Sequence, residues 1–137
     1  MRIKTKHLRR ILLLHEKWLR KDPKGVRADL TGADLSEKEL SSANLAMAIL
    51  VSVNFSGAHL SFANLMGADL TDSIFIDASM PGINFVAATL KNVDFTDSII
   101  VGANFWKADM TNVVLDGAKY ENANFSCVQN LPQNLAV

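Results

Sequence analysis

The chain has 137 residues, which suits a single domain, and 49% of them are apolar, which excludes a disordered chain. Its 14 Lys and Arg residues balance 14 Asp and Glu residues, and this argues against a globally basic nucleic-acid-binding protein. The charges are unevenly distributed along the chain. Residues 1–27 hold ten basic and two acidic residues, a net charge of +8, so the remaining residues carry −8.

Residues 1–27 are predicted to form an amphipathic helix followed by a linker. The helix is expected to end near Asp22–Gly25, where Pro23 interrupts it. One face is apolar and is expected to cap the segment that follows, while a basic face that binds a membrane surface or a nucleic acid is the alternative. The apolar face contains Leu8, Ile11, Leu12, His15, Trp18 and Leu19.

Residues 28–127 contain a five-residue repeat. From residue 30 to residue 125 every fifth residue is large and apolar, and these twenty positions hold ten Leu, six Phe, two Met, Ile100 and Tyr120. The residue two positions earlier is usually Ala, and the residue between them is Asp or Asn in eleven of the twenty units, as in Ala33-Asp34-Leu35. Five residues match neither the helical nor the strand period, so each unit is predicted to be a short strand followed by a corner.

Longer periods predict how many units make one turn of the chain. Asn precedes the large residue at 44, 64, 84, 104 and 124, and the six Phe fall in the columns 55/75/95 and 85/105/125. Stacked amides and stacked rings are typical of parallel strand stacks, so four pentads per coil are expected. A competing period of 25 residues relates Ser73–Ile76 to Ser98–Val101, and we interpret it as segment duplication.

These twenty units in register resemble the pentapeptide repeat family over residues 28–127. The lead-in, Leu14 to Leu19 and then Arg27 to Leu30, is similar to that of bacterial and phage members. The resemblance implies an all-β solenoid, a right-handed quadrilateral β-helix of about five coils, here with an N-terminal α-helical cap. Lys38 departs from the pattern because it occupies an inward position, so a distorted coil or a side chain that reaches solvent is expected there.

Residues 128–137 are predicted to be a C-terminal cap or tail, with Val128, Leu131, Pro132 and Leu135 as its apolar residues. The alternative is that Tyr120 and Phe125 lie near an interface.

No catalytic, metal or cofactor site is predicted. His7, His15 and His59 are scattered, and the Gly residues sit at corners rather than in a phosphate-binding loop. Cys127 is the one cysteine, so no intrachain disulfide forms and a cytoplasmic location is expected. No apolar stretch approaches the roughly 20 residues of a membrane span. We expect a protein that is not an enzyme, does not span a membrane and does not bind nucleic acid directly.

Candidate functional residues lie on the outer faces of the predicted rod. When each pentad is assigned to one face, two adjacent faces carry most of the negative charge. These candidate acidic faces contain Asp29, Asp69, Asp72 and Asp109 on the first and Asp34, Glu37, Asp77, Asp94, Asp97 and Asp116 on the second. The fourth face aligns a candidate apolar interaction column beside the Asn series, formed by Ala46, Met66, Val86 and Trp106.

Two functions from different classes follow. The first is a rigid scaffold for protein–protein interaction, which binds an unknown protein or a second copy of the chain through the apolar column. The second comes from the resemblance to quinolone-resistance members of the family, and it is an acidic DNA mimic that binds DNA gyrase or topoisomerase. Duplex DNA carries about one charge per 1.7 Å of axis, so a rod of about 24 Å would need roughly 14 charges to match it. The two acidic faces offer a net nine, which favours the scaffold.

Overall fold

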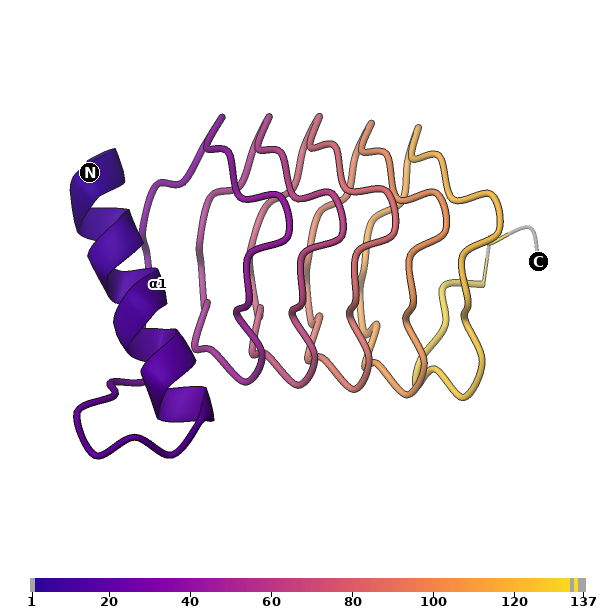
Figure 1. Cartoon of the computed structure of the whole chain (residues 1–137). Coiled ribbons are helices and arrows are strands. Elements are labelled where there is room, and N and C mark those ends of the chain that lie inside the picture. Colours follow the sequence, from indigo (N-terminus) through magenta and orange to yellow (C-terminus); the bar gives the residue numbers. More distant parts are fainter. Residues whose placement is uncertain (1, 134, 136–137) are drawn as a thin grey trace.

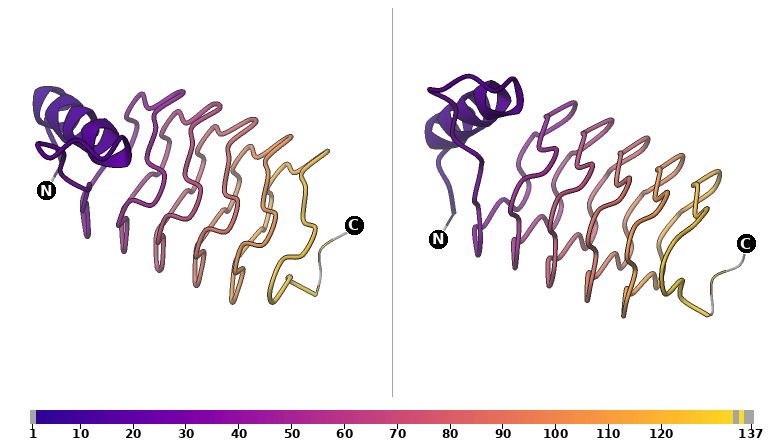
Figure 2. Two further views of the ribbon diagram at one scale, coloured as in Figure 1. Left: turned by 60° about the horizontal axis from the view of Figure 1, so that its bottom comes forward. Right: turned by 90° about the horizontal axis from the view of Figure 1, so that it is seen from below.

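The computed structural model describes residues 2–133 and residue 135 of the chain. A single helix in this part, α1 (Thr5–Leu19), lies across one end of a stack of coils, and residues 128–133 lie at the other end (Figures 1 and 2). The helix is shorter than predicted, because the chain turns at Arg20 and Lys21 adopts a left-handed backbone with φ of 63°. Amides of Arg20, Lys21 and Asp22 bond back to the last turn of the helix.

Parallel bridges join residues that are twenty positions apart, as the sequence predicts. Each coil contributes one bridge residue to each of four short sides, and the bridges are isolated pairs rather than long strands. We number the sides by their bridge residues: side 1 begins at 29, side 2 at 34, side 3 at 39 and side 4 at 44, each with a member every twenty residues. For reference, coils 1 to 5 are residues 28–47, 48–67, 68–87, 88–107 and 108–127.

The backbone hydrogen bonds explain why the repeat has five residues. In the pentad after Leu30, for example, the amides of Gly32 and Leu35 donate to carbonyls of the next coil, at Val51 and Asn54. The Ala33 amide donates to the Leu30 carbonyl and closes a four-residue turn. The two residues that follow the large apolar residue, here Thr31 and Gly32, are the first and second corner residues of the pentad. The amide of the first corner residue has no such backbone partner. Pro81 occupies one of these first corner positions, where its missing N–H costs no coil-to-coil bond.

The second corner residue has a positive φ in every pentad from Gly32 to Cys127, with values between 56° and 74°. This pattern identifies type II turns, in which the third residue is left-handed. Gly occupies six of these positions, and the other residues accept the strain, including the bulky Phe62.

Two stacks of Phe rings fill the centre of the rod. Phe55, Phe75 and Phe95 form one stack with ring centroids 4.6 and 5.3 Å apart, and Phe85, Phe105 and Phe125 form the other at 5.3 and 5.1 Å. Rings of one stack meet rings of the other edge to face, at interplanar angles of 70° to 85°. Both arrangements are favourable for aromatic rings, so the predicted Phe columns are confirmed as the core.

The N-terminal helix is held on coil 1 by a buried histidine. His15 is fully buried; its Nε2–H donates to the Ala46 carbonyl at 2.8 Å, and its Nδ1 accepts the Ala28 amide at 2.9 Å. These two bonds require the neutral ring with its proton on Nε2. Burial lowers the pKa of His15 below its ordinary value of 6.5, with a smaller contribution from the charge of Arg27, and this favours the same neutral form.

The inward Lys38 is accommodated without loss of the coil. Glu39 next to it still pairs with His59, and the Lys38 Nζ donates to the Thr5 hydroxyl at the start of α1, 3.1 Å away. Arg2 also pairs with Asp34, so the first residues of the chain cover the edge of coil 1 at side 2. An open end of the stack therefore lets an inward lysine bond to the cap.

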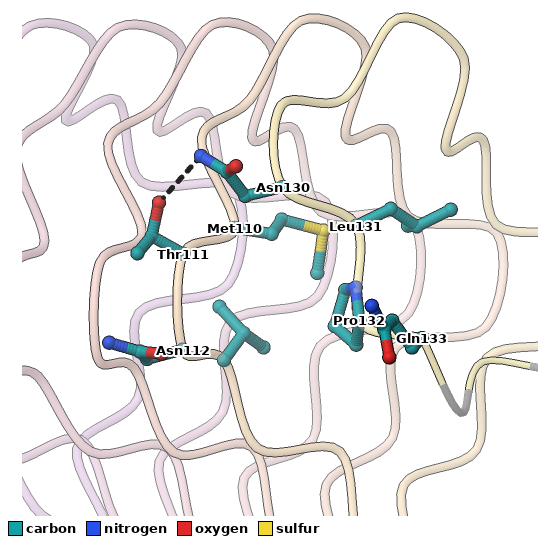
Figure 3. A pocket seen from close by; sticks show the side chains of 8 residues that line it. Met110, Thr111, Asn112, Asn130, Leu131, Pro132 and Gln133 are labelled. Atoms are coloured by element: carbon teal, nitrogen blue, oxygen red, sulfur yellow. Dashed lines mark hydrogen bonds between the residues drawn. The ribbon is translucent and has the colours of Figure 1, made fainter.

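The C-terminal segment continues along side 1 and is tied to coil 5 (Figure 3). Gln129 pairs with Asp109, and the Asn130 side chain donates to the Thr111 hydroxyl at 2.8 Å across a pocket that Leu131 and Pro132 also line. Leu131 and Val128 are half-buried against the core, as are the aromatic rings of coil 5, Tyr120 and Phe125. Residues 134, 136 and 137 of the predicted cap or tail lie outside the described residues.

Candidate protein-binding face

Side 4 has an outer surface without a charged residue. The turn bends between its two corner residues, so three residues of each coil point outward on side 4. They are the second corner residue before the bridge Asn, the bridge Asn itself and the first corner residue after it. From coil 1 to coil 5 these are Ser42, Asn44 and Ala46; Phe62, Asn64 and Met66; Gly82, Asn84 and Val86; Gly102, Asn104 and Trp106; and Asn122, Asn124 and Ser126. We call this set the uncharged face.

Three large apolar side chains stand out from the uncharged face. Phe62 is 70% exposed, Met66 is 42% exposed and Trp106 is 39% exposed. The Lys107 ammonium lies 4.3 Å from the centre of the Trp106 ring, where a cation is attracted to the π-face. Aromatic and Met residues are enriched at the centre of protein interfaces, where charged residues are depleted.

The predicted apolar column needs one correction. Met66 and Trp106 are exposed and Val86 is half-buried, but Ala46 is only 9% exposed, and its carbonyl accepts the bond from His15 of the cap. Phe62 was not predicted as part of the column. Its signal in the sequence is its position two residues before Asn64, at the corner where side 4 begins.

The bridge Asn residues cap the turns. Each Oδ1 atom of Asn44, Asn64, Asn84, Asn104 and Asn124 accepts the amide two residues later, the first corner amide that lacks a backbone partner. A side-chain bond also joins Asn124 to Asn104 at 3.2 Å. The Asn series is therefore explained chiefly by turn capping, with the bond between stacked amides as an addition.

Half of the predicted acidic residues serve the same structural purpose. The bridge carboxylates accept the amide two residues later and, where that residue is Thr, its hydroxyl as well: Asp29, Asp34, Asp69, Asp94 and Asp109. The bond from the Thr31 hydroxyl lowers the pKa of Asp29, and the Thr111 hydroxyl does the same for Asp109. These groups stabilise corners whether or not they bind anything.

The other five predicted acidic residues lie at corners and are exposed. Glu37, Asp72, Asp77, Asp97 and Asp116 belong to this set. Glu37, Asp77 and Asp97 begin side 3, whereas Asp72 begins side 2 and Asp116 ends it. The exposed carboxylates therefore lie on sides 2 and 3. Glu37 lies 4.0 Å from the Arg2 guanidinium, and Asp72 accepts a bond from the Asn92 amide group.

Two family models match the sequence. The "Pentapeptide repeat region" model covers residues 48–125, more than half of the chain, and the "Pentapeptide repeats (8 copies)" model covers residues 26–61. The chain belongs to the pentapeptide repeat family. Among curated proteins, none matches the sequence.

Solved structures of pentapeptide repeat proteins are similar to this one. A protein of the Arabidopsis thaliana thylakoid lumen is 25% identical over 78% of this chain and 70% of its own, with a TM-score of 0.56. Rfr23 from the cyanobacterium Cyanothece 51142 is 30% identical over 72% of this chain, with a TM-score of 0.38. QnrB1, a plasmid-mediated fluoroquinolone resistance protein, is 20% identical over 74% of this chain, with a TM-score of 0.45. The chain spans 60% of Rfr23 and 59% of QnrB1.

Membership of the pentapeptide repeat family implies the predicted right-handed β-helix, and the structure itself shows the N-terminal helix. Within residues 2–133 and 135, no helix is long and apolar enough to cross a bilayer. The same part of the chain contains no group of three or more His, Cys, Asp or Glu residues placed to hold a metal ion.

Proposed function

We propose that this pentapeptide repeat protein is a non-enzymatic scaffold that binds a protein partner along the uncharged face. The observation that carries the proposal is the exposure of Phe62, Met66 and Trp106 on the side of the rod that has no charged residue. Charged residues are depleted and aromatic and Met residues are enriched at the centres of protein interfaces.

The architecture supports binding by a rigid surface. The bridge residue of each coil on side 4 is paired with the coil above, the coil below or both, and an Asn side chain caps each corner that ends this side. A surface that is already ordered loses little conformational entropy when a partner binds. The hydrogen-bonded backbone of this face and its exposed apolar side chains fit a partner that presents its own apolar side chains.

The test is affinity capture from the native host with two matched triple variants. Phe62→Ser, Met66→Ser and Trp106→Ser together remove the anchors of the uncharged face. Ile74→Ser, Ile99→Ser and Val114→Ser remove exposed apolar residues from sides 2 and 3, with exposures of 37% to 39% that match those of Met66 and Trp106. We expect the wild type and the second variant to capture the same partner and the first variant to lose it. Equal capture by both variants would contradict the proposal.

The second candidate is a DNA mimic that binds gyrase or topoisomerase through the acidic residues. Sides 2 and 3 support it, because their exposed corner carboxylates lie on adjacent sides. The capping role of the bridge carboxylates is against it, since this role accounts for half of the predicted acidic residues. The test is a gyrase supercoiling assay, in which inhibition by the wild type that is lost in Asp77→Asn, Asp97→Asn and Asp116→Asn together would favour the mimic.

A further inference from the structure

We propose that the uncharged face binds a second copy of this chain and forms an antiparallel, side-by-side dimer. The proposal rests on the proposed function of this face as a protein-binding surface and names its partner. A two-fold axis that runs along side 4 of coil 3 relates the copies. Coil 2 of one copy then faces coil 4 of the other, coil 1 faces coil 5, and coil 3 faces itself.

The shape of the face fits itself in this register. The Phe62 side chain of coil 2 leans towards coil 3 and covers its own Gly82, where a Cβ atom would lie 2.5 Å from the ring. At Gly102 of coil 4 no atom lies within 4 Å of the Cβ position, so the backbone there is open. The antiparallel register brings residue 62 of each copy opposite residue 102 of the other. Each Phe62 ring, which leans from coil 2 towards coil 3, then lies beside the open Gly102 of the second copy.

The other residues of the uncharged face also lie opposite suitable partners in this register. Met66 of one copy lies opposite Trp106 of the other, a favourable contact between a thioether and an aromatic ring. Asn64 lies opposite Asn104, and Asn84 lies opposite itself. The Oδ1 atoms of these residues hold the corner amides, so their NH₂ groups are available to donate across the interface.

Charge complementarity favours a second copy and the antiparallel direction. None of the residues of the uncharged face is itself charged, and the Lys107 ammonium beside Trp106 already has a cation–π partner in that ring. Residues 1–27 carry +8 and the rest of the chain −8, which makes the rod strongly dipolar. Antiparallel rods place each basic cap beside coil 5 of the other copy, where Asp109, Asp116, Lys119 and Glu121 give a net charge of −2, whereas parallel rods place the two basic caps together.

The size of the face predicts a weak dimer. Five coils at about 4.8 Å give a height of about 24 Å, and the side with its corners is about 15 to 20 Å wide. Both copies together then bury about 700 to 1,000 Å², at the low end of specific interfaces. We expect association in the range of about 10 µM and above, decreasing with added salt.

Cross-linking tests the register. In a Cys127→Ser background, which removes the one native cysteine, we mix Ser61→Cys with Val101→Cys and treat the mixture with a short bismaleimide. These positions neighbour Phe62 and Gly102 at the edge between sides 3 and 4, and they lie beside each other across the interface only in the antiparallel dimer. Ser61→Cys mixed with Met66→Cys is the matched parallel pair. We expect the first mixture to form a covalent dimer, and a cross-link in the second mixture alone would overturn the antiparallel register.

Sedimentation equilibrium tests the glycine contact. Gly102→Asn fills the open position with a residue that tolerates a left-handed backbone, as Asn92, Asn112 and Asn122 do in this chain. Gly32→Asn is the control, because Gly32 has a similar φ of 74° and equally open surroundings but lies on side 2. We expect Gly102→Asn to weaken dimerisation about 100-fold, about tenfold for each of two equivalent contacts, and Gly32→Asn to leave it unchanged.

The outcomes separate this inference from the proposed function. A wild type that remains monomeric at about 500 µM, well above the range expected for an interface of this size, overturns the dimer. If the wild type is monomeric but capture of another protein still depends on Phe62, Met66 and Trp106, the dimer is rejected and the proposed function stands. If both variants of the capture test behave alike and the wild type is monomeric, both proposals fail.

Discussion

Some corner glycines leave room for a side chain of the preceding coil. The side chains of Met47, Phe62 and Asp97 occupy the space where a Cβ atom at Gly67, Gly82 and Gly117 would lie. The spacing is twenty residues in each case, so the pairs are visible in the sequence once the coil length is known. Gly32 has a similar backbone but no such neighbour.

We predict that Gly82→Ala is more destabilising than Gly32→Ala. Both substitutions place a side chain at a left-handed position, at a cost of about 1 to 2 kcal/mol. Only Gly82→Ala also displaces the Phe62 ring, so its free energy of unfolding should fall further. Urea unfolding of dilute protein measures the difference, and equal losses in the two variants would show that the ring moves without cost.

A second prediction at this scale concerns His15 and pH. The unfolded chain protonates a histidine near pH 6.5, whereas burial keeps the pKa of His15 lower in the folded chain. The unfolded state therefore binds more protons as the pH falls below 6.5, and the contribution of His15 to stability, present above that pH, is lost. The slope is at most about 1.4 kcal/mol per pH unit for one proton.

Urea unfolding between pH 7.5 and about 5 measures this loss, above the range in which most carboxylates titrate. His15→Gln can make both hydrogen bonds with a neutral amide, so its stability should vary less with pH. His7 and His59 are exposed and remain in both proteins. The same pH dependence in His15→Gln as in the wild type would assign the effect to other groups.

At the scale of the corner, Asp and Asn recur because one amide in each pentad lacks a backbone partner. The side chain two residues earlier supplies the acceptor, and an amide oxygen does this as well as a carboxylate oxygen. The preference for Asp or Asn in the sequence is thus a requirement of the turn. The choice between them sets the charge of each side and leaves the corner intact.

We predict that Asn64→Ala lowers the free energy of unfolding by about 0.5 to 1.5 kcal/mol, the net value of one hydrogen bond. Asn64→Asp keeps the acceptor for the Met66 amide and should be close to the wild type. Thr89→Ala is the control, because it changes the same repeat position at a bridge residue that is not Asp or Asn. Thermal unfolding of dilute protein compares the three, and an equal loss in Asn64→Ala and Asn64→Asp would contradict the capping role.

On the scale of the whole molecule, each coil contacts only its neighbours, so the two ends are stabilised differently from the centre. Inward side chains of coils 2 to 4 are fully or almost fully buried, as are those at the start of coil 5, whereas the later ones of coil 5, such as Leu115 and Phe125, are half-buried. The N-terminal end is covered by α1 and by the bridge of Arg2 to Asp34. Local opening is therefore expected to start at coil 5.

Amide hydrogen exchange rates along the rod test this prediction. We expect the ladder amides of residues 113–128 to exchange faster than those of coils 2 to 4. The amides of coil 1 should be intermediate, since the helix covers them. Uniform protection along the rod would show instead that the stack opens as one cooperative unit.

Most of the fold could be predicted from the sequence because every column of the rod repeats at a fixed spacing. The period, the Phe core and the capping helix all leave patterns of this kind. The double hydrogen bond of His15 could not be predicted, since an imidazole in an apolar stripe also fits simple packing. Phe62 was missed because its column mixes Ser, Phe, Gly and Asn. Sequence alone also could not divide the carboxylates into those that cap turns and those that are free.

The pairing of residues twenty apart also restricts how this chain can change in length. An insertion or deletion of five residues preserves every pentad but rotates all later coils by one side, so that the Asn series would be split between two sides. The 25-residue relation between Ser73–Ile76 and Ser98–Val101 shows such a rotation, because Ile74 lies on side 2 and Ile99 on side 3. Only changes by whole coils keep the uncharged face continuous, so related chains that use this face should differ in length by multiples of twenty residues within the rod.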